Sequence, residues 1–386
     1  MTEQSLAMSI YSRIDKPLLV AFLAALSIGL IMVASASVNF AHEQRADQLY
    51  FLKRHLVYLT LGISIAIIAI RVPLNAWYLL SPYLLMGAIA LLALVLIPGI
   101  GLRVNGSQRW LNAGPLTLQV SELAKIGLIL FLAGYLVRRG DDLRSQWHGF
   151  AVPAGLLMLM VMLLILEPDF GSVVVITGVT CALLFLAGIP LGVFLALAAS
   201  GIAALSFFAL SSPYRMQRIT AFVDPWADQF NSGYQLTQSL IAFGRGEWFG
   251  VGLGNSLQKL FYLPEAHTDF VFAIIAEELG LVGALAVLGL LFFIVARIIR
   301  LGVLACRKGE VFGGYVAIGV GVLFGLQAAI NMGVSSGLFP TKGLTLPFIS
   351  YGGSSLLVCL FFAAICLRIS MELQEKTTGT RRADRD

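Results

Sequence analysis

A series of long, uninterrupted apolar stretches constrains the fold of this 386-residue chain more than any other feature. A helix needs about 20 apolar residues to cross roughly 30 Å of hydrocarbon, and the stretches reach about that length. The strands of a membrane β-barrel would instead be short segments that alternate in polarity. We therefore predict an all-α, polytopic membrane protein with about ten transmembrane helices. The expected spans cover residues 18–38, 56–70, 78–98, 121–137, 150–166, 171–188, 190–210, 270–296, 312–334 and 354–370.

The composition excludes a soluble globular protein. Hydrophobic residues make up 58% of the chain and charged residues 12%, whereas soluble domains contain about 45–50% apolar and about 25% charged residues. The net charge of +5 comes from Lys and Arg residues scattered through the connections, so membrane lipid rather than nucleic acid is the expected partner. The four cysteines form no CxxC pair, and we expect small hydrophobic side chains rather than a disulfide or metal site.

The distribution of basic residues predicts the orientation of the spans. Lys and Arg are more frequent in the connections that face the cytoplasm when the N-terminus is placed inside, and this placement makes both termini cytoplasmic. The first span ends in small residues, 34–37, which resemble a signal-peptide cleavage site. The span is nevertheless longer than the roughly 7–15 residues of a secretory apolar region. We therefore expect an uncleaved first span.

The chain is organised as one multispan membrane domain, residues 1–370, followed by a polar tail. A large outer loop, residues 211–268, separates the seventh expected span from the eighth. The tail, residues 371–386, is polar and charged without apolar periodicity, so we expect a disordered cytoplasmic end.

The unusual polar sequences are predicted to lie on the face opposite the cytoplasm. They occupy the outer connections 101–125, 167–172, 211–269 and 337–355, whereas the inner connections are short and basic. The last of the four contains two prolines and three glycines within 340–355, and such backbone is tolerated at membrane depth only against protein or a wet cavity. A site on this face has no access to ATP, so its substrate has to arrive already activated, most plausibly on a lipid carrier.

Asp269 is the candidate catalytic residue. Thr268 is a good N-cap, which would place Asp269 in the first turn of the following span, and Pro264 disfavours helical geometry before it. The helix dipole stabilises a carboxylate in that position by about 0.3–1 kcal/mol. An ionised carboxylate on a rigid helix end is suited to act as a general base. The alternative is that Asp269 only completes the cap.

Further ionisable residues are expected inside the spans, where they are costly and have either a partner or a function. Glu277 and Glu278 lie about two turns below Asp269, and ion pairing and a functional role are equally compatible with the sequence. Glu122 and Lys125 are i,i+3 neighbours that can pair with each other. Lys125 could instead meet a phosphate group or the Asp269 carboxylate, although self-pairing is the slightly better prediction.

The long outer loop contains Arg215 and Arg218, and arginine pairs at a membrane face are suited to bidentate binding of a diphosphate. Contact with lipid headgroups is the alternative. The glycine-rich segment 250–254 looks like a phosphate cradle, but no strand precedes it, so we do not expect a dinucleotide site.

Six segments of the chain form a distinctive set, namely Arg109-Trp110, 119–125, Pro168-Asp169-Phe170-Gly171, 262–270, 276–280 and 340–355. Together they resemble one family of membrane proteins, the SEDS family. The resemblance extends over nearly all the expected spans in order, and the combined motifs are highly specific. One departure is Val120, where the family commonly has Pro. Segments 259–267 and 341–347 resemble the cell-division members of the family more than the elongation members.

The resemblance implies a peptidoglycan glycosyltransferase that polymerises lipid II outside the cytoplasm, usually with a class B penicillin-binding protein as partner. It maps the family's essential aspartate onto Asp269, which would be the base of an inverting transfer. The undecaprenyl diphosphate that leaves needs charge neutralisation, to which a divalent cation such as Mg²⁺ or Mn²⁺ could contribute. The candidate substrate- and diphosphate-binding residues are Arg109, Lys125, Arg218, Lys342, His267 and Ser354, with Glu122, Glu277 and Glu278 in supporting roles.

Two other functions are compatible with the same spans. A lipid II flippase would need Lys125, Glu277 and Glu278 to form a polar path through the bilayer, but the unusual residues stop well short of the inner connections. A non-catalytic scaffold for a partner synthase gives no reason for the outer Asp, Arg and Pro-Gly segments. We therefore expect the polymerase, located with other division proteins at the septum in the bacterial cytoplasmic membrane.

Overall fold

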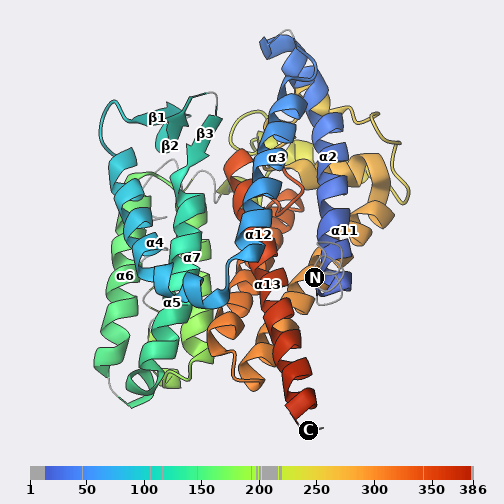
Figure 1. Cartoon of the computed structure of the whole chain (residues 1–386). Coiled ribbons are helices and arrows are strands. Elements are labelled where there is room, and N and C mark those ends of the chain that lie inside the picture. Colours follow the sequence, from blue (N-terminus) through green and yellow to red (C-terminus); the bar gives the residue numbers. More distant parts are fainter. Residues whose placement is uncertain are drawn as a thin grey trace.

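The computed structural model shows a bundle of long helices with a small sheet at one end (Figure 1). It describes residues 14–45, 47–104, 106–114, 116–145, 147–192, 194–196, 199, 201, 216, 220–341 and 343–383. The helices are α2 (Lys16–Arg45), α3 (Tyr50–Arg71), α4 (Leu74–Val95), α5 (Val120–Ser145), α6 (Trp147–Leu166), α7 (Phe170–Leu186), α10 (Tyr234–Gly246), α11 (Val271–Arg307), α12 (Val311–Ser335) and α13 (Gly353–Ala383). The strands are β1 (Gly101–Val104), β2 (Ser107–Ala113) and β3 (Leu116–Gln119), and a short π-helix, η1 (Gln258–Tyr262), lies in the long outer loop.

Within the described residues, eight helices are long and apolar enough to cross a membrane, namely α2 to α6 and α11 to α13. They coincide with eight of the expected spans. Helix α7, with 17 residues, coincides with a ninth. The expected span 190–210 lies mostly outside the described residues. The structure therefore confirms a polytopic helical membrane protein, while the number of spans and their orientation stay predictions.

Helices α5, α12 and α13 form the centre of the bundle, because most of their residues are buried. Helices α3, α4 and α11 instead expose apolar side chains over much of their length, as lipid-facing helices do. Glycines allow the close approach of α11 and α12. A Cβ atom added to Gly302 of α11 would lie 2.8 Å from the carbonyl oxygen of Gly314 in α12. Small residues at such contacts are typical of helix packing in membranes.

The segment 101–119, expected as a loop in an all-α fold, is instead a three-stranded antiparallel sheet. Strand β1 pairs with β2, and β2 pairs with β3, so that Trp110 lies opposite Gln119. The sequence Asn105-Gly106 separates β1 from β2, and Gly106 has a φ of 78°. Asn-Gly is a strong hairpin signal, because both residues tolerate positive φ. The sheet leads directly into α5 and holds Arg109 at this end of the bundle.

The start of α2 and the later parts of α11 and α13 lie at the same end of the bundle. The Asp15 carboxylate pairs with Arg297 of α11 (2.9 Å), and the Asp15 backbone N–H donates to the Ser370 hydroxyl of α13 (3.2 Å). The sheet lies at the opposite end (Figure 1). The polar outer connections therefore gather at the sheet end.

Helix α11 is interrupted at Gly280, whose φ of 69° and ψ of −169° are not helical. The loop 247–252 bridges this interruption with four backbone hydrogen bonds. The N–H groups of Val251 and Gly252 donate to the carbonyl oxygens of Glu277 and Glu278, and those of Leu281 and Val282 donate to Glu247 and Trp248. Gly250 packs directly against the Glu278 carbonyl group, where no side chain would fit. The glycines at 250 and 252 therefore serve a helix contact.

Helix α13 continues past the expected end of the membrane domain at residue 370 and reaches Ala383, whereas the expected disorder of the tail stays a prediction. Met371 is buried, and Glu372 pairs with Arg368 one turn earlier (2.7 Å). Extending an existing helix needs no new nucleation, which explains how a polar segment continues the last span.

Candidate active site

Asp269 lies in the turn that precedes α11. The helix begins at Val271 with Phe270 as its N-cap, so the expected cap by Thr268 is wrong. The Thr268 hydroxyl donates instead to the backbone oxygen (3.1 Å) and the side chain (2.8 Å) of Glu265. Asp269 is therefore held by a turn and by its neighbours rather than by a helical cap.

The connection between α12 and α13 lies directly against the Asp269 carboxylate. A Cβ atom added to Gly343 would be 2.6 Å from Oδ2 of Asp269. The Asn331 side-chain amide of α12 donates to the backbone oxygens of Asp269 (2.8 Å) and Leu344 (2.6 Å), which joins the two connections. The irregular backbone around 343 thus forms a wall of the site.

The surroundings of Asp269 place its titration near neutral pH. Burial is the main reason that the pKa of Asp269 is raised to about 7, the negative charge of Glu265 acts in the same direction, and the Arg109 guanidinium acts in the opposite one. The residue as a whole is partly exposed. A carboxylate with these properties is suited to accept a proton at neutral pH.

Arg109 of β2 is the basic residue that the described structure places near Asp269. One of its terminal nitrogens lies 3.5 Å from the Asp169 carboxylate, and the other donates to Ser107 (3.1 Å). About a quarter of the side chain is exposed (26%). Arg109 therefore remains available to an anionic ligand beside Asp269.

Asp169 fixes this arrangement from the turn between α6 and α7. Its carboxylate accepts hydrogen bonds from the hydroxyl groups of Ser121 (2.7 Å) and Ser172 (2.9 Å) and from the Gln119 amide (3.4 Å). Asp169 is also the N-cap of α7, where it accepts from the backbone N–H of Ser172. The contacts join β3, α5 and α7 around one buried charge.

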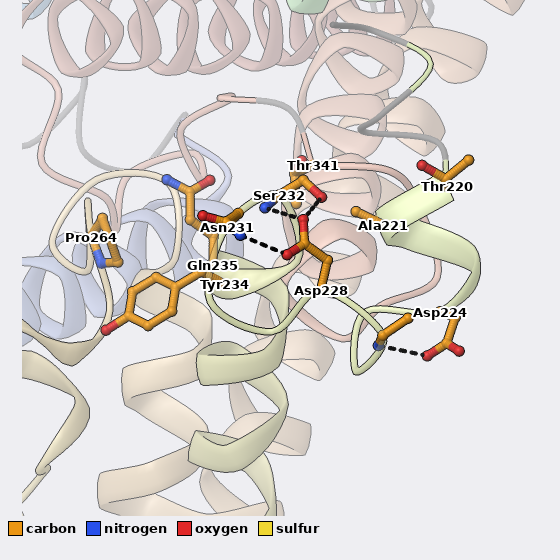
Figure 2. A pocket seen from close by; sticks show the side chains of 11 residues that line it. Thr220, Ala221, Asp224, Asp228, Asn231, Ser232, Tyr234, Gln235, Pro264 and Thr341 are labelled. Atoms are coloured by element: carbon orange, nitrogen blue, oxygen red, sulfur yellow. Dashed lines mark hydrogen bonds between the residues drawn. The ribbon is translucent and has the colours of Figure 1, made fainter.

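A polar groove of about 970 Å³ is lined in part by Pro264 and Thr341 (Figure 2). These two residues precede Asp269 and Gly343 in the chain by five and two positions, and Gly343 lies against the Asp269 carboxylate. Tyr234 and Gln235 point toward Pro264 from the start of α10 (Figure 2). The complete lining is Thr220, Ala221, Asp224, Ala227, Asp228, Asn231, Ser232, Tyr234, Gln235, Pro264 and Thr341. Hydroxyl, amide and carboxylate groups of this kind can bind the hydroxyl groups of a sugar.

The structure uses His267 and Ser354 for internal contacts. The His267 ring packs against Phe51 and Phe40 with centroid distances of 4.8 and 5.1 Å, and burial lowers the pKa of His267. A neutral imidazole offers no positive charge to a diphosphate. The Ser354 hydroxyl accepts from the Gln119 backbone N–H (2.8 Å) and is 2% exposed. Neither residue lines the groove, and their expected contact with substrate stays a prediction.

Lys125 and Glu122 form the buried i,i+3 pair that was the preferred prediction, with 2.6 Å between Nζ and Oε1. The Lys125 side chain is 1% exposed, so its charge is neutralised inside the protein and its expected role in diphosphate binding finds no support.

Glu277 and Glu278 also have internal partners, which favours the ion-pair alternative for both. Glu277 pairs with Arg245 (2.6 Å) and accepts from Ser256, whereas Glu278 pairs with Lys259 (2.7 Å) and accepts from the Ser35 hydroxyl of α2 (2.7 Å). The two carboxylates therefore fasten the long outer loop to α11 and α2.

Two expected diphosphate ligands, Arg218 and Lys342, lie outside the described residues. Their role stays a prediction. The expected Mg²⁺ or Mn²⁺ ion stays a prediction as well. Among the residues that the structure describes, no three His, Cys, Asp or Glu side chains are placed to hold a metal ion.

The sequence did not predict two neighbours of Asp269, Gly343 and Asn331, because their contacts with Asp269 depend on how α12 packs against the turn before α11. Asp169 entered only through the family resemblance, although an aspartate directly before an apolar span is either a cap or a site residue.

Replacing Gly343 with Ala is expected to lower activity by about 10- to 100-fold while changing stability little. The new methyl group would displace the flexible end of the Asp269 side chain rather than backbone, and a shift of about 1 Å at a reacting group can cost about 100-fold. Polymerisation rate and thermal unfolding of the purified variant test this. Gly289→Ala is the matched control, because no atom lies within 4 Å of a Cβ at that position. Unchanged activity in Gly343→Ala would contradict the expected contact.

Residues 16–375 match the family described as Cell cycle protein, which covers FtsW, RodA and SpoVE. Two relatives carry the name Probable peptidoglycan glycosyltransferase FtsW. The chain is 51% identical to that of Saccharophagus degradans over 366 residues, 95% of each chain. It is 54% identical to that of Hahella chejuensis over 359 residues, which cover 93% of this chain and 90% of the relative.

Two solved structures share the fold. A chain of a peptidoglycan synthase complex that coordinates polymerization and crosslinking superposes with a TM-score of 0.74 at 29% identity, over 93% of this chain and 98% of that one. The rod shape determining protein RodA of Thermus thermophilus superposes with a TM-score of 0.68 at 28% identity, over 92% and 96% of the two chains. Sequence and fold thus agree over almost the whole length, and the chain belongs to the FtsW/RodA/SpoVE family of cell cycle proteins.

Proposed function

We propose that the chain is a peptidoglycan glycosyltransferase that polymerises lipid II into glycan strands on the outer face of the bacterial cytoplasmic membrane. The observation that carries this proposal is the Asp269 carboxylate, which lies against Gly343 and whose pKa of about 7 reflects burial and the charges of Glu265 and Arg109. The names of the curated relatives support the same activity.

The proposed reaction is an inverting transfer. Asp269 removes the proton from a sugar hydroxyl of the incoming lipid II, and the resulting oxygen attacks the anomeric carbon of the growing chain. The bond between that carbon and the diphosphate oxygen breaks, and undecaprenyl diphosphate leaves with the electron pair. The groove lined in part by Pro264 and Thr341 would hold sugar rings of the substrate, and fixed positioning of reactants lowers the barrier.

Arg109 has the charge that the leaving diphosphate requires. A diphosphate needs little protonation, but the negative charge that develops on it has to be stabilised by nearby cations. Arginine suits this task because its planar guanidinium group can make two parallel hydrogen bonds to phosphate oxygens. Arg109 is partly exposed, and its positive charge acts on Asp269, which supports this assignment.

The buried ion pairs do not support a flippase. A polar path across the bilayer would need ionisable groups that are free to bind the passing headgroup, but Lys125, Glu277 and Glu278 all have partners at 2.6–2.7 Å.

Supplying lipid II to the purified chain and looking for glycan polymer tests the proposal, because a flippase or a scaffold would produce none.

The rate of polymerisation is expected to fall as the pH decreases through about 7. Asp269 acts as a base only when it is ionised, and its raised pKa of about 7 leaves about a tenth of the molecules ionised one pH unit lower. A series of initial rates between about pH 5 and 8 measures this limb. A rate that stays constant down to about pH 5 would reject Asp269 as the titrating base.

We propose further that the chain acts with a crosslinking partner, a class B penicillin-binding protein, at the division septum. The relative in a complex that coordinates polymerization and crosslinking supports the first point. The FtsW names of the curated relatives support the second. Co-purification with the partner and fluorescence microscopy of the tagged chain test the two points separately.

A further inference from the structure

Glu167 is a buried carboxyl group that the mechanism above does not use. It lies in the turn between α6 and α7, two residues before Asp169, and its exposed fraction is 0%. Neither of its carboxyl oxygens has a hydrogen-bond partner within the described structure. Buried polar groups without a partner are rare in proteins, and each one calls for an explanation.

Asp169, in the same turn, shows how a charged carboxylate is accommodated here. Its oxygens accept from Ser121, Ser172 and Gln119 and lie beside Arg109. Glu167 has none of these donors. A carboxylate without donors is far more costly to bury than a neutral carboxyl group, so its surroundings favour the neutral form of Glu167.

The charged groups that act on Glu167 within the described residues are Asp169 from its own turn and Arg109 from β2. Burial raises the pKa of Glu167 to about 8, Asp169 acts in the same direction, and Arg109 acts against them. Arg109 therefore interacts electrostatically with three carboxyl groups, those of Asp169, Glu167 and Asp269.

The turn that carries Glu167 is joined to Asp269 through one layer of backbone. A Cβ atom at Gly171, the second residue of α7, would lie 3.0 Å from the Leu344 side chain and 3.4 Å from the Gly343 carbonyl oxygen. Gly343 in turn lies against the Asp269 carboxylate. The helix that follows Glu167 thus packs against the wall of the site, and Glu167 itself does not line the groove.

We propose that Glu167 is a positioning residue, kept uncharged so that Asp169 is the one buried carboxylate that competes for Arg109, which leaves part of the Arg109 charge for the departing diphosphate. This inference rests on the proposed glycosyltransferase function. When Glu167 ionises, a second buried carboxylate attracts the guanidinium group, and the positive charge available to the diphosphate decreases. The protein then loses transition-state stabilisation, although Asp269 is fully ionised.

The proposal predicts that the rate of polymerisation falls at alkaline pH because Glu167 ionises. One pH unit above a pKa of about 8, about a tenth of Glu167 is still protonated, so the wild-type kcat at about pH 9 should be about tenfold below the value expected with Glu167 fully protonated. Glu167→Gln keeps the size of the side chain and cannot ionise. It should stay within about twofold of wild type at pH 7 and lack the tenfold loss at pH 9.

The experiment measures kcat and KM for lipid II polymerisation by the purified full-length chain between about pH 6 and 10. Glu247→Gln is the matched control, because it removes an exposed carboxylate of the outer loop and should keep the wild-type alkaline limb. The proposal is overturned if Glu167→Gln retains the same alkaline loss. It is also overturned if Glu167→Gln is as inactive at pH 7 as a variant without the base, since an uncharged side chain would then not suffice.

Infrared spectroscopy gives a readout that does not depend on activity. At pH 7, the difference between the infrared spectra of wild type and Glu167→Gln should show the C=O stretching band of a protonated carboxylic acid. This band should disappear at high pH. Its absence at pH 7 would overturn the proposal. If wild type makes no polymer at any pH, the proposed function fails, whereas the infrared band still decides the charge of Glu167.

Discussion

Replacing Asp269 with Asn is expected to lower glycan polymerisation by at least about 100-fold, because general-base catalysis contributes about 10²- to 10⁴-fold. Asn has the same size as Asp and preserves the contact with Gly343, and the hydrogen bond from Asn331 uses the backbone oxygen, which the substitution retains. The variant should therefore fold normally and bind substrate. Gel analysis of the polymer from purified protein, together with thermal unfolding, measures both properties.

Glu265→Gln is the informative control for this experiment. Glu265 is an exposed neighbour whose negative charge helps to raise the pKa of Asp269. Removing that charge should preserve polymerisation and move the acid limb of the rate profile to lower pH. Glycan strands of near-normal length and yield from Asp269→Asn would rule out Asp269 as the base.

Replacing Glu278 with Ala is expected to destabilise the folded chain by about 3–5 kcal/mol, the usual cost of leaving one partner of a buried ion pair alone. The Lys259 ammonium group, 5% exposed at the side chain, would keep only the Ser35 hydroxyl (3.0 Å) as a partner. Because the pair connects the outer loop to α11 and α2, a large decrease in the unfolding temperature of the purified protein should follow.

The double variant Lys259→Met/Glu278→Gln separates the charge from the packing. It removes both charges and keeps side chains of similar size, so it should lose much less stability than Glu278→Ala. Equal losses in the two variants would show that the attraction between the two charges, rather than the cost of an unpaired lysine, accounts for the loss. A loss below about 1 kcal/mol in Glu278→Ala would contradict the importance of the pair.

The spans and the local pairs were predictable from the sequence because each depends on neighbouring residues only. Apolar length identified the membrane helices, and the i,i+3 spacing identified the Glu122–Lys125 pair. Where a local signal was overlooked, as in the Asn105-Gly106 hairpin, the information was present in the sequence.

The remainder of the site depends on tertiary contacts that no local pattern encodes. Arg109 meets Asp169 only because the sheet folds over the start of α7, and Thr268 fails as a cap because the Glu265 backbone and side chain take its hydroxyl group. Whether a buried acid has donors, as Asp169 does and Glu167 does not, is likewise a property of packing.

The bridged interruption of α11 has a mechanical consequence for Asp269. Four backbone hydrogen bonds from loop 247–252 connect the helix on both sides of Gly280, so this point is a rigid joint instead of a hinge. A rigid joint transmits a tilt of the lipid-facing part of α11 to the start of the helix at Val271, about 13 Å away at 1.5 Å per residue. A tilt of only about 5° then displaces the turn that carries Asp269 by roughly 1.2 Å, and a shift of about 1 Å at a reacting group can cost about 100-fold in rate. A protein in the bilayer that tilts α11 would therefore change the position of Asp269 and the rate of the reaction.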